Sequence, residues 1–181
     1  MKKILPLLFL AFVGFTAYSC DNDDDTVVQN PVDNDTYSQM RDVTGSFTSG
    51  NTYAFTQAIA IEQTDVVLVY RKAGNAWQQI PKTVYLDTAT SPAARKFDYN
   101  FVFDSQNVQI RIDDQNFNLG TGLSTQEIAN YLSNQTFRIV LVPASQSKSA
   151  SKNAGVDYSD YNAVVKYFNL DETKVKTTNV N

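Results

Sequence analysis

The sequence predicts a mainly β protein: an antiparallel β-sandwich or small barrel of about six to eight strands, with one or two short helices near the C-terminus. Three observations lead to this fold class. Apolar and polar residues alternate over several short runs, turn-forming residues separate the runs, and no long helical pattern lies between consecutive runs. Alternating strands without long connecting helices favour antiparallel sheets over a parallel α/β fold.

The clearest strand pattern is FDYNFVFD, which begins at Phe97. Its aromatic residues occupy every second position, so they share one face of a half-buried strand while the polar residues share the other. Residues 66–70 are instead a continuous apolar run, which is typical of a strand covered on both faces. Residues 77–86 are less regular, and Pro81 cannot donate a backbone hydrogen bond, so we expect an edge strand there. In chain order, strands are expected within residues 53–61, 66–70, 77–86, 97–103, 108–112 and 137–141.

Two short helices are expected in the second half of the chain. Ser124 and Glu127 have the spacing of a capping box, in which each side chain bonds the backbone N–H of the other residue, and a helix through Leu132 follows. A second helix is indicated by apolar residues at intervals of three and four. These residues are Tyr158, Tyr161, Val165 and Phe168. Such a stripe covers a sheet more often than it binds a partner, and the sequence leaves both interpretations open.

The first residues have the three-part layout of a secretory signal. A basic start, Met1 to Lys3, is followed by an almost wholly apolar stretch and then by small residues before Cys20. The 16 residues from Ile4 to Ser19 would form a helix of about 24 Å, against a hydrocarbon core of roughly 30 Å. A cleaved leader therefore fits this segment better than a membrane-spanning helix.

Small residues at Ala17 and Ser19 directly before Cys20 resemble the lipobox of bacterial lipoproteins. The resemblance implies that the leader is cut before Cys20, and that the cysteine sulfur and the new amino group are acylated. Three acyl chains would give a lasting membrane anchor, whereas one chain binds only marginally. The alternative is that Cys20 is an ordinary small residue near an ordinary cleavage site.

An acidic run follows Cys20 and resembles the surface-export signal of Bacteroidota lipoproteins. Its acidic residues are Asp21, Asp23, Asp24 and Asp25. The resemblance implies a protein in the outer membrane that is displayed on the cell surface, and the periplasmic face is the alternative. Considered only as a charge pattern, the run is typical of a solvated, flexible tether.

These features divide the chain into four parts. We expect a signal peptide over residues 1–19, a lipidated cysteine with an acidic tether over 20–36, a single β-rich domain over 37–172, and a disordered tail over 173–181. After cleavage 162 residues would remain, with a net charge of −6 in place of −4 because Lys2 and Lys3 are lost. One domain is the natural number for that length.

Composition excludes several classes of function. An acidic chain without a basic cluster argues against nucleic acid as a partner, because nucleic-acid affinity comes largely from Lys and Arg at phosphates. The chain has no histidine, which removes Ser-His-Asp and Cys-His mechanisms and most zinc sites. We therefore expect no enzyme activity and no cofactor other than the covalent lipid on Cys20.

Two sets of residues are weak candidates for other sites. Asp114, Asn116 and Asn118 offer oxygen ligands at every second position, as a calcium loop does, but Gly120 comes one residue too late for an EF-hand. A strand end followed by a turn explains the same pattern. Thr26 and Thr88 each lie between an aspartate and an aliphatic residue, which resembles the acceptor pattern for O-glycosylation in Bacteroidota.

Two roles remain for the mature chain. The leading expectation is a lipid-anchored, non-catalytic interaction or structural module with an unknown protein or glycan partner. The alternative is a carbohydrate-binding accessory lipoprotein, in which exposed Trp77, Tyr85 or Tyr70 would stack on sugar rings beside hydrogen-bonding side chains.

Overall fold

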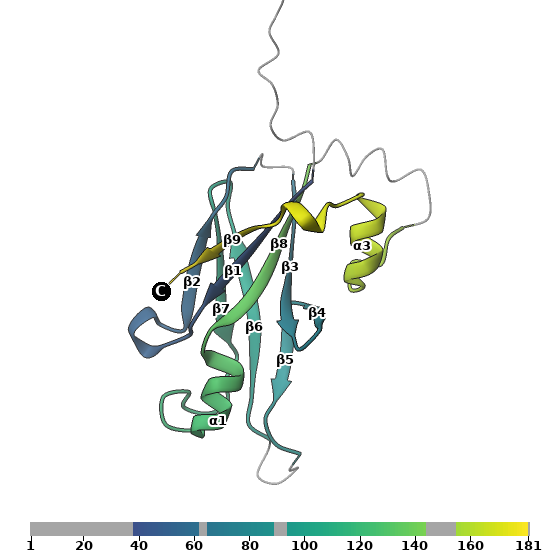
Figure 1. Ribbon diagram of the computed structural model, residues 1–181. Coiled ribbons are helices and arrows are strands. Elements are labelled where there is room, and N and C mark those ends of the chain that lie inside the picture. Colours follow the sequence, from purple (N-terminus) through teal and green to yellow (C-terminus); the bar gives the residue numbers. More distant parts are fainter. Residues whose placement is uncertain (1–37, 62–64, 89–93, 144–154, 181) are drawn as a thin grey trace, which may run out of the picture. The chain divides into compact units, whose positions relative to one another are not determined.

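Two β-sheets face each other in the computed structural model (Figure 1), which describes residues 38–61, 65–88, 94–143 and 155–180. All of these residues belong to the unit that runs from Asp33 to Asn181. The five-stranded sheet has the order β4-β3-β8-β1-β9, and the four-stranded sheet has the order β2-β7-β6-β5. The strands are β1 (Gln39–Gly45), β2 (Ala54–Ala58), β3 (Val66–Ala73), β4 (Ala76–Gln79), β5 (Lys82–Tyr85), β6 (Lys96–Phe103), β7 (Asn107–Asp113), β8 (Gln135–Val142) and β9 (Lys176–Asn179). The predicted mainly β fold is confirmed, as an open sandwich rather than a closed barrel.

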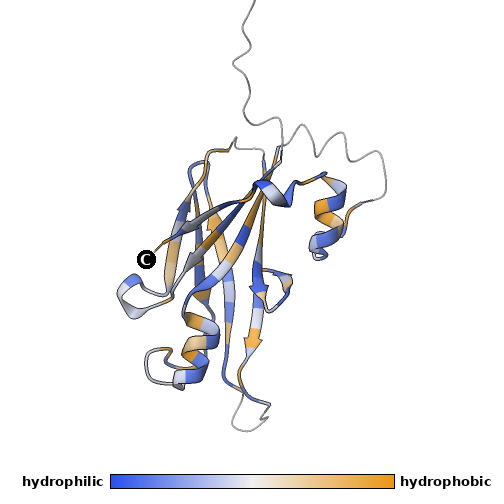
Figure 2. Ribbon diagram, viewed as in Figure 1, coloured by the Kyte–Doolittle hydropathy of each residue, from blue (hydrophilic) through white to orange (hydrophobic). Residues whose placement is uncertain are grey.

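The main core fills the space between the two sheets. Phe47 lies near its centre, where its ring centroid is 4.9 Å from that of Phe55, 5.8 Å from that of Tyr99 and 6.0 Å from that of Phe137. Phe97 and Tyr99 are fully buried, as their alternation along β6 predicts. Figure 2 shows the same alternation as bands of apolar and polar residues along several strands.

A second core lies on the outer face of the five-stranded sheet. Helix α3 (Tyr161–Tyr167) packs there, with Tyr161, Val164 and Phe168 directed at the sheet. On the sheet side its neighbours are Met40, Leu68, Tyr70, Val140 and Val142. Of the predicted stripe, Tyr161 and Phe168 therefore cover the sheet, but Tyr158 precedes α3 and is 39% exposed, and Val164 rather than Val165 is the fully buried valine. The run from Val67 to Tyr70 is buried because β3 has a core on both faces, whereas Val66 is only partly buried.

The chain passes from one sheet to the other between β4 and β5. Ile80 donates its backbone N–H to the carbonyl of Val69 in the five-stranded sheet, at 3.0 Å. Two residues later, Lys82 pairs with Tyr99 in the four-stranded sheet. Residues 77–86 do lie at an edge, as predicted, but they form edge strands of two different sheets because the chain crosses over beside Pro81.

The prediction of a disordered tail from residue 173 is wrong for the residues up to Val180. A turn of 3-10 helix, η3 (Glu172–Lys174), is followed by β9, which pairs in parallel with β1. Val180 then donates its N–H to the carbonyl of Thr44 and packs against the main core. All four residues of β9 are exposed, so its order comes from backbone pairing, which leaves no apolar pattern in the sequence.

A short helical segment joins β7 to β8. It consists of α1 (Thr125–Glu127) and one turn of π-helix, η2 (Ile128–Leu132), and its only buried residue is Leu132. A further 3-10 turn, η1 (Ser49–Asn51), follows β1. Within the described part of the chain, none of the helices is long and apolar enough to cross a membrane.

Candidate functional site

The residues that the sequence links to lipidation and surface export, and one of the two candidate acceptors for O-glycosylation, lie outside the described residues. These are Cys20, Asp21, Asp23, Asp24 and Asp25, together with the acceptor Thr26. Thr88, the other candidate acceptor for O-glycosylation, is described and exposed. It follows Asp87, whose carboxylate is bound by Arg95.

Two of the three candidate calcium ligands, Asn116 and Asn118, use their side-chain oxygens to accept backbone hydrogen bonds. The Oδ1 atom of Asn116 accepts the backbone N–H of Lys96 at 2.8 Å, and its Nδ2 donates to the carbonyl of Ala94. Asn118 Oδ1 accepts the N–H of Gly120 at 2.8 Å. Among the described residues no group of three or more His, Cys, Asp and Glu side chains could hold a metal ion. These contacts give Asn116 and Asn118 a role in fixing the loop after β7, as the turn interpretation expects.

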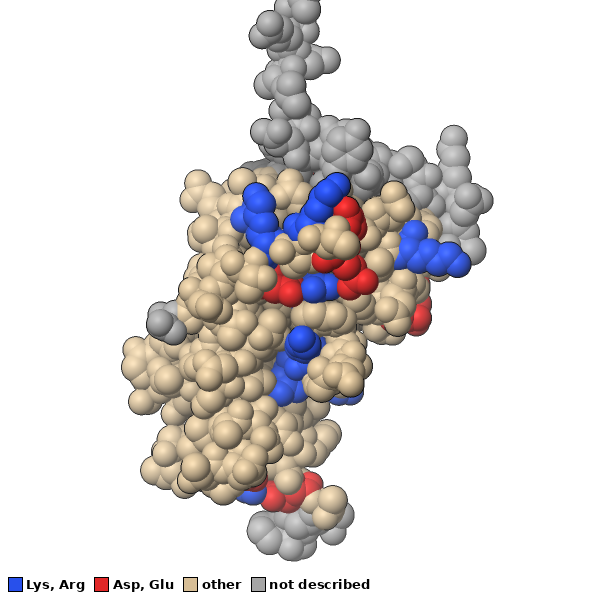
Figure 3. Space-filling view, viewed as in Figure 1, with Lys and Arg blue, Asp and Glu red and all other residues tan. Residues whose placement is uncertain are grey.

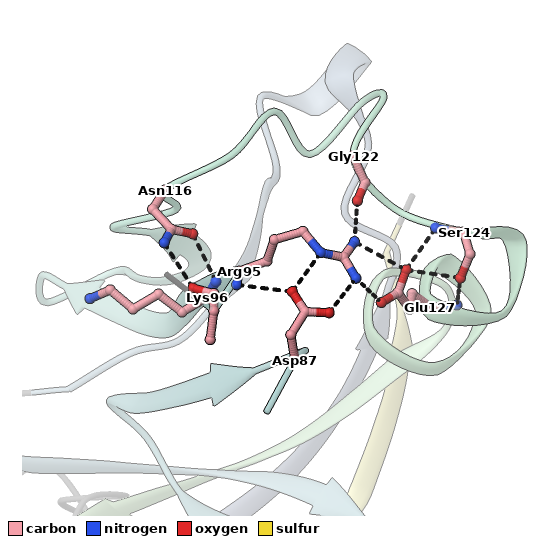
Figure 4. Close-up of polar contacts among 8 residues, drawn as sticks. Asp87, Arg95, Lys96, Asn116, Gly122, Ser124 and Glu127 are labelled. Atoms are coloured by element: carbon pink, nitrogen blue, oxygen red, sulfur yellow. Dashed lines mark hydrogen bonds and ion pairs between the residues drawn. The ribbon is translucent and has the colours of Figure 1, made fainter. Parts of the chain in front are cut away.

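The same loop leads to a cluster of charged residues around Arg95 (Figure 4). The guanidinium of Arg95 binds both carboxylate oxygens of Asp87 at 2.8 Å, and its Nη2 also reaches Glu127 Oε1 at 2.8 Å. It donates in addition to the carbonyl of Gly122. Glu127 completes the predicted capping box, because its Oε2 accepts the N–H of Ser124 at 2.7 Å while Ser124 Oγ accepts the N–H of Glu127. Arg95 thus ties together the end of β5, the loop after β7 and the start of α1.

The Arg95 cluster keeps its two acids ionised. Hydrogen bonds from the Arg95 side chain lower the pKa of Asp87 to about 2. The pKa of Glu127 is also lowered, first by the backbone N–H of Ser124 and then by Arg95. A general acid or base works best with a pKa near the operating pH. The cluster is therefore suited to holding loops together and not to proton transfer near neutral pH.

A second charged cluster, centred on Arg138, lies under the C-terminal segment. Arg138 donates from Nε and Nη2 to the two carboxylate oxygens of Asp42 at 2.7 and 2.9 Å, and from Nη1 to Glu172 at 2.8 Å and to the Tyr161 hydroxyl. Its guanidinium carbon is 4.3 Å from the centroid of the Trp77 ring. Figure 3 shows basic and acidic side chains interleaved over this part of the five-stranded sheet.

Burial and hydrogen bonding oppose each other in the Arg138 cluster. Burial lowers the pKa of Arg138, but the bonds to Asp42 and Tyr161 outweigh it and the net pKa is raised. The pKa of Tyr161 is raised to about 12, chiefly by burial and then by the hydrogen bond to Glu172. The Arg138 guanidinium therefore stays charged at physiological pH, and the cluster connects β1, β8, α3 and η3.

The three aromatic residues proposed for sugar stacking do not form a common surface. Tyr70 is fully buried, and its hydroxyl donates to the carbonyl of Tyr158 at 2.8 Å. Trp77 is partly buried between Arg138 and Tyr161. Tyr85 alone is open, with 66% of its surface exposed. It pairs with Lys96, which places it on the outer face of the four-stranded sheet.

Polar and partly exposed residues line that outer face. Across β6 and β7 its cross-strand pairs are Asp98 with Asp113, Asn100 with Arg111 and Val102 with Gln109. None of these six residues is buried. Asp113 Oδ2 accepts hydrogen bonds from Asn100 and Arg111, whereas the buried Oδ1 of Asp98 has no partner among the described residues. A polar face of this kind can hydrogen-bond an extended ligand.

At one end of this face lies a shallow, open pocket of about 390 Å³. Its lining residues are Thr56, Val102, Phe103, Asp104, Asn107 and Gln109. Val102 and Phe103 are 43% and 48% exposed, so the pocket has an apolar side and an amide side. The alternation along β6 predicts Phe103 as a core residue, but β5 begins only at Lys82, opposite Tyr99, and no strand of the described chain pairs with β6 on that side beyond it. The only signal in the sequence for where β5 begins is Pro81.

No protein-family model, curated protein or solved structure matches this chain.

Proposed function

We propose that this protein is a non-catalytic interaction module, held at the outer membrane by lipid on Cys20 and displayed on the cell surface. The observation that carries the proposal is the difference between the two sheets. The outer face of the five-stranded sheet is covered by α3, whereas that of the four-stranded sheet is polar, partly exposed and ends in an open pocket. An open face with exposed apolar residues at its end is typical of a surface that meets a partner.

The chemistry of the described charged groups supports a binding role over a catalytic one. The carboxylates of Asp87 and Asp42 are held by arginines. The chain contains no histidine to act as a base near neutral pH. Binding by shape and hydrogen bonds requires no such group.

The anchor is tested by a Cys20→Ser variant of the full chain, expressed in its own host. Without the acylated sulfur, the protein should leave the envelope and appear in the soluble fraction, whereas a Ser19→Ala variant should behave as wild type. A Cys20→Ser protein that is still processed and stays with the envelope would contradict the lipid anchor.

Surface display is tested separately by changing Asp21, Asp23, Asp24 and Asp25 to Asn. The altered protein should remain membrane-bound but become protected from protease added to intact cells.

The binding face is tested by a photo-crosslinking residue placed at Gln109 in intact cells. Gln109 lines the pocket on the open face, whereas Gln126 is exposed on α1 and provides a matched control. We expect a discrete crosslinked product from position 109 and none from position 126. Equal products from the two positions would contradict a specific face.

A carbohydrate ligand is the second candidate, and the exposure of Tyr85 favours it. The ring of Tyr85 lies on the same outer face as the amide and carboxylate groups of β6 and β7. An exposed aromatic ring beside polar groups is a common arrangement for binding sugars. The protein should then bind at least one glycan on a broad panel, and Tyr85→Ala should abolish the signal. Absence of binding to the whole panel would remove this candidate.

A further inference from the structure

The last part of β6 has an open backbone edge. β5 pairs with β6 only as far as Tyr99, which faces Lys82. The preceding residue that would continue β5, Ile80, is bonded to Val69 in the other sheet. Residues 101–103 therefore have a neighbour on the β7 side and no strand on the other side among the described residues.

The geometry of the β6-β7 hairpin shows which backbone groups face this edge. The hairpin closes with the N–H of Asp104 donating to the carbonyl of Asn107 at 3.0 Å. Hydrogen-bonded and non-bonded pairs alternate along an antiparallel ladder, so Val102 bonds toward β7 while Phe101 and Phe103 direct their N–H and C=O groups outward. The N–H of Phe101 is taken by Asn100 Oδ1 at 2.8 Å. The carbonyl of Phe101 and both backbone groups of Phe103 have no strand partner in the described part of the chain.

The side chains on the open edge are apolar. Phe103 and Val102 are 48% and 43% exposed, and the rings of Phe101 and Phe103 stack with centroids 6.2 Å apart. Edge strands are usually protected by a charge, a proline or a bulge, because a free apolar edge pairs with other strands. Residues 100–103 contain neither a charged residue nor a proline.

We propose that this edge pairs with the same edge of a second copy of the chain, in an antiparallel dimer whose two-fold axis passes through Val102. In this register Val102 faces Val102 of the second copy, and Phe101 faces Phe103 on the inner side. Asp104 then faces Asn100, so no like charges meet. The two four-stranded sheets become one sheet of eight strands, and each copy supplies the strand that the other lacks.

Self-complementarity is the argument for a second copy as the partner. An isologous interface requires one segment to match its own reverse, and residues 100–104 do so at every position: amide with acid, ring with ring, valine with valine. The proposal goes beyond the anchored interaction module and does not depend on the lipid.

The first experiment is disulfide crosslinking of the full chain with Val102→Cys. In the proposed register this position is a non-hydrogen-bonded pair, where Cβ atoms lie about 4.5–5.5 Å apart, close to the range that a disulfide accepts. Wild type, which contains Cys20, gives the background level. Thr56→Cys is the matched control, since Thr56 is exposed on the same face but lies on β2. We expect a linked dimer from Val102→Cys well above both controls.

The second experiment measures recovery of one tagged copy of the full chain with a differently tagged copy. Phe103→Lys in both copies places an ammonium group in the apolar interface, and recovery should fall about tenfold or more. Tyr85→Lys changes a more exposed aromatic of the same sheet that lies outside the interface, and should leave recovery unchanged. Circular dichroism checks that both variants are folded. The proposal is overturned if wild-type copies do not co-purify, if the two variants behave alike, or if the Val102→Cys variant links to another protein in place of a second copy.

Discussion

Three arginines, each lying over an aromatic ring, connect distant parts of this chain. The guanidinium carbons of Arg71, Arg95 and Arg138 are 4.7, 5.7 and 4.3 Å from the nearest ring centroids, those of Tyr99, Phe117 and Trp77. A planar guanidinium can stack on a ring while its edge donates several hydrogen bonds. The mature chain would have no disulfide, because its single cysteine is the proposed lipid site. Arginine therefore provides cross-connections that disulfides give to many other secreted domains.

We expect Arg95→Gln to return the pKa of Asp87 from about 2 toward the ordinary value of 3.8. A carboxyl whose folded pKa is depressed stabilises the fold above its unfolded pKa, and this contribution is lost as the pH falls through the folded pKa. The free energy of unfolding of the wild type should therefore fall between about pH 4 and pH 2, with a shallower slope in the variant. Carboxyl chemical shifts in an NMR titration measure the pKa directly. Arg111→Gln, which removes the ion-pair partner of Asp113, should leave the Asp87 titration unchanged.

The two acids that bind Arg138 should differ in their effect on stability. The Asp42 side chain is 16% exposed and makes a two-pronged contact with the Arg138 side chain, which is 9% exposed, whereas the Glu172 side chain is 51% exposed. Breaking a buried pair leaves an uncompensated charge, so Asp42→Asn should lower the free energy of unfolding by about 3 kcal/mol. Glu172→Gln should cost less than about 1 kcal/mol, because water screens the exposed pair. Urea denaturation measures both variants, and equal losses would show that the two ion pairs are equivalent.

At the scale of the element, alternation predicts the strands that have one buried and one exposed face. Strands β6 and β7 follow this rule along most of their length. Alternation does not predict strand β1, because Met40 on its outer face is buried under α3 and Asp42 on the same face is partly buried against Arg138. It does not predict β9 either, because all side chains of β9 are exposed. A local pattern cannot report burial or pairing that arises from distant parts of the chain.

The candidate site likewise has a local part that the sequence predicts and a part, built from distant segments, that it does not. The capping box at Ser124 and Glu127 is a local motif, and the sequence predicts it correctly. The role of Arg95 depends on a loop and a helix more than twenty residues away, so neither spacing nor composition predicts it. The exposed end of β6 depends on the crossing of the chain at Ile80, for which Pro81 is only an indirect signal. Contacts between distant segments therefore account for the part that the sequence does not predict.

Hydrogen exchange should rank the strands of the five-stranded sheet by their position in it. All residues of β8 except Thr136 are buried, and β8 lies between β3 and β1. β9 pairs on one side only and has four exposed residues. Local opening needs less free energy where few apolar contacts are lost, so the amides of β9 should exchange fastest and those of β8 slowest. Protection of β9 equal to that of β8 would mean that the last strand opens only when the whole domain unfolds.

At the scale of the whole molecule, the five-stranded sheet serves both cores. Its inner face contributes Val43, Val69, Phe137 and Ile139 to the main core, and its outer face packs against α3. Any loss of α3 would expose the large side chains of the second core, among them Leu68, Tyr70, Val140 and Val142. At roughly 1.5–3 kcal/mol each, these four represent about 6–12 kcal/mol, which is comparable to the whole stability of a typical domain at about 5–15 kcal/mol.

The two cores should therefore unfold in one transition. Trp77 is the only tryptophan of the chain and contacts Arg138 and Tyr161, so its fluorescence reports on the α3 layer. Far-UV circular dichroism reports mainly on the strands. In urea the two signals should have the same midpoint, because exposure of the second core is too costly to occur alone. Val164→Ala, which truncates a fully buried residue of α3, should shift both midpoints together to lower urea. A fluorescence midpoint that moves ahead of the circular dichroism midpoint in this variant would show that α3 unfolds separately from the sandwich.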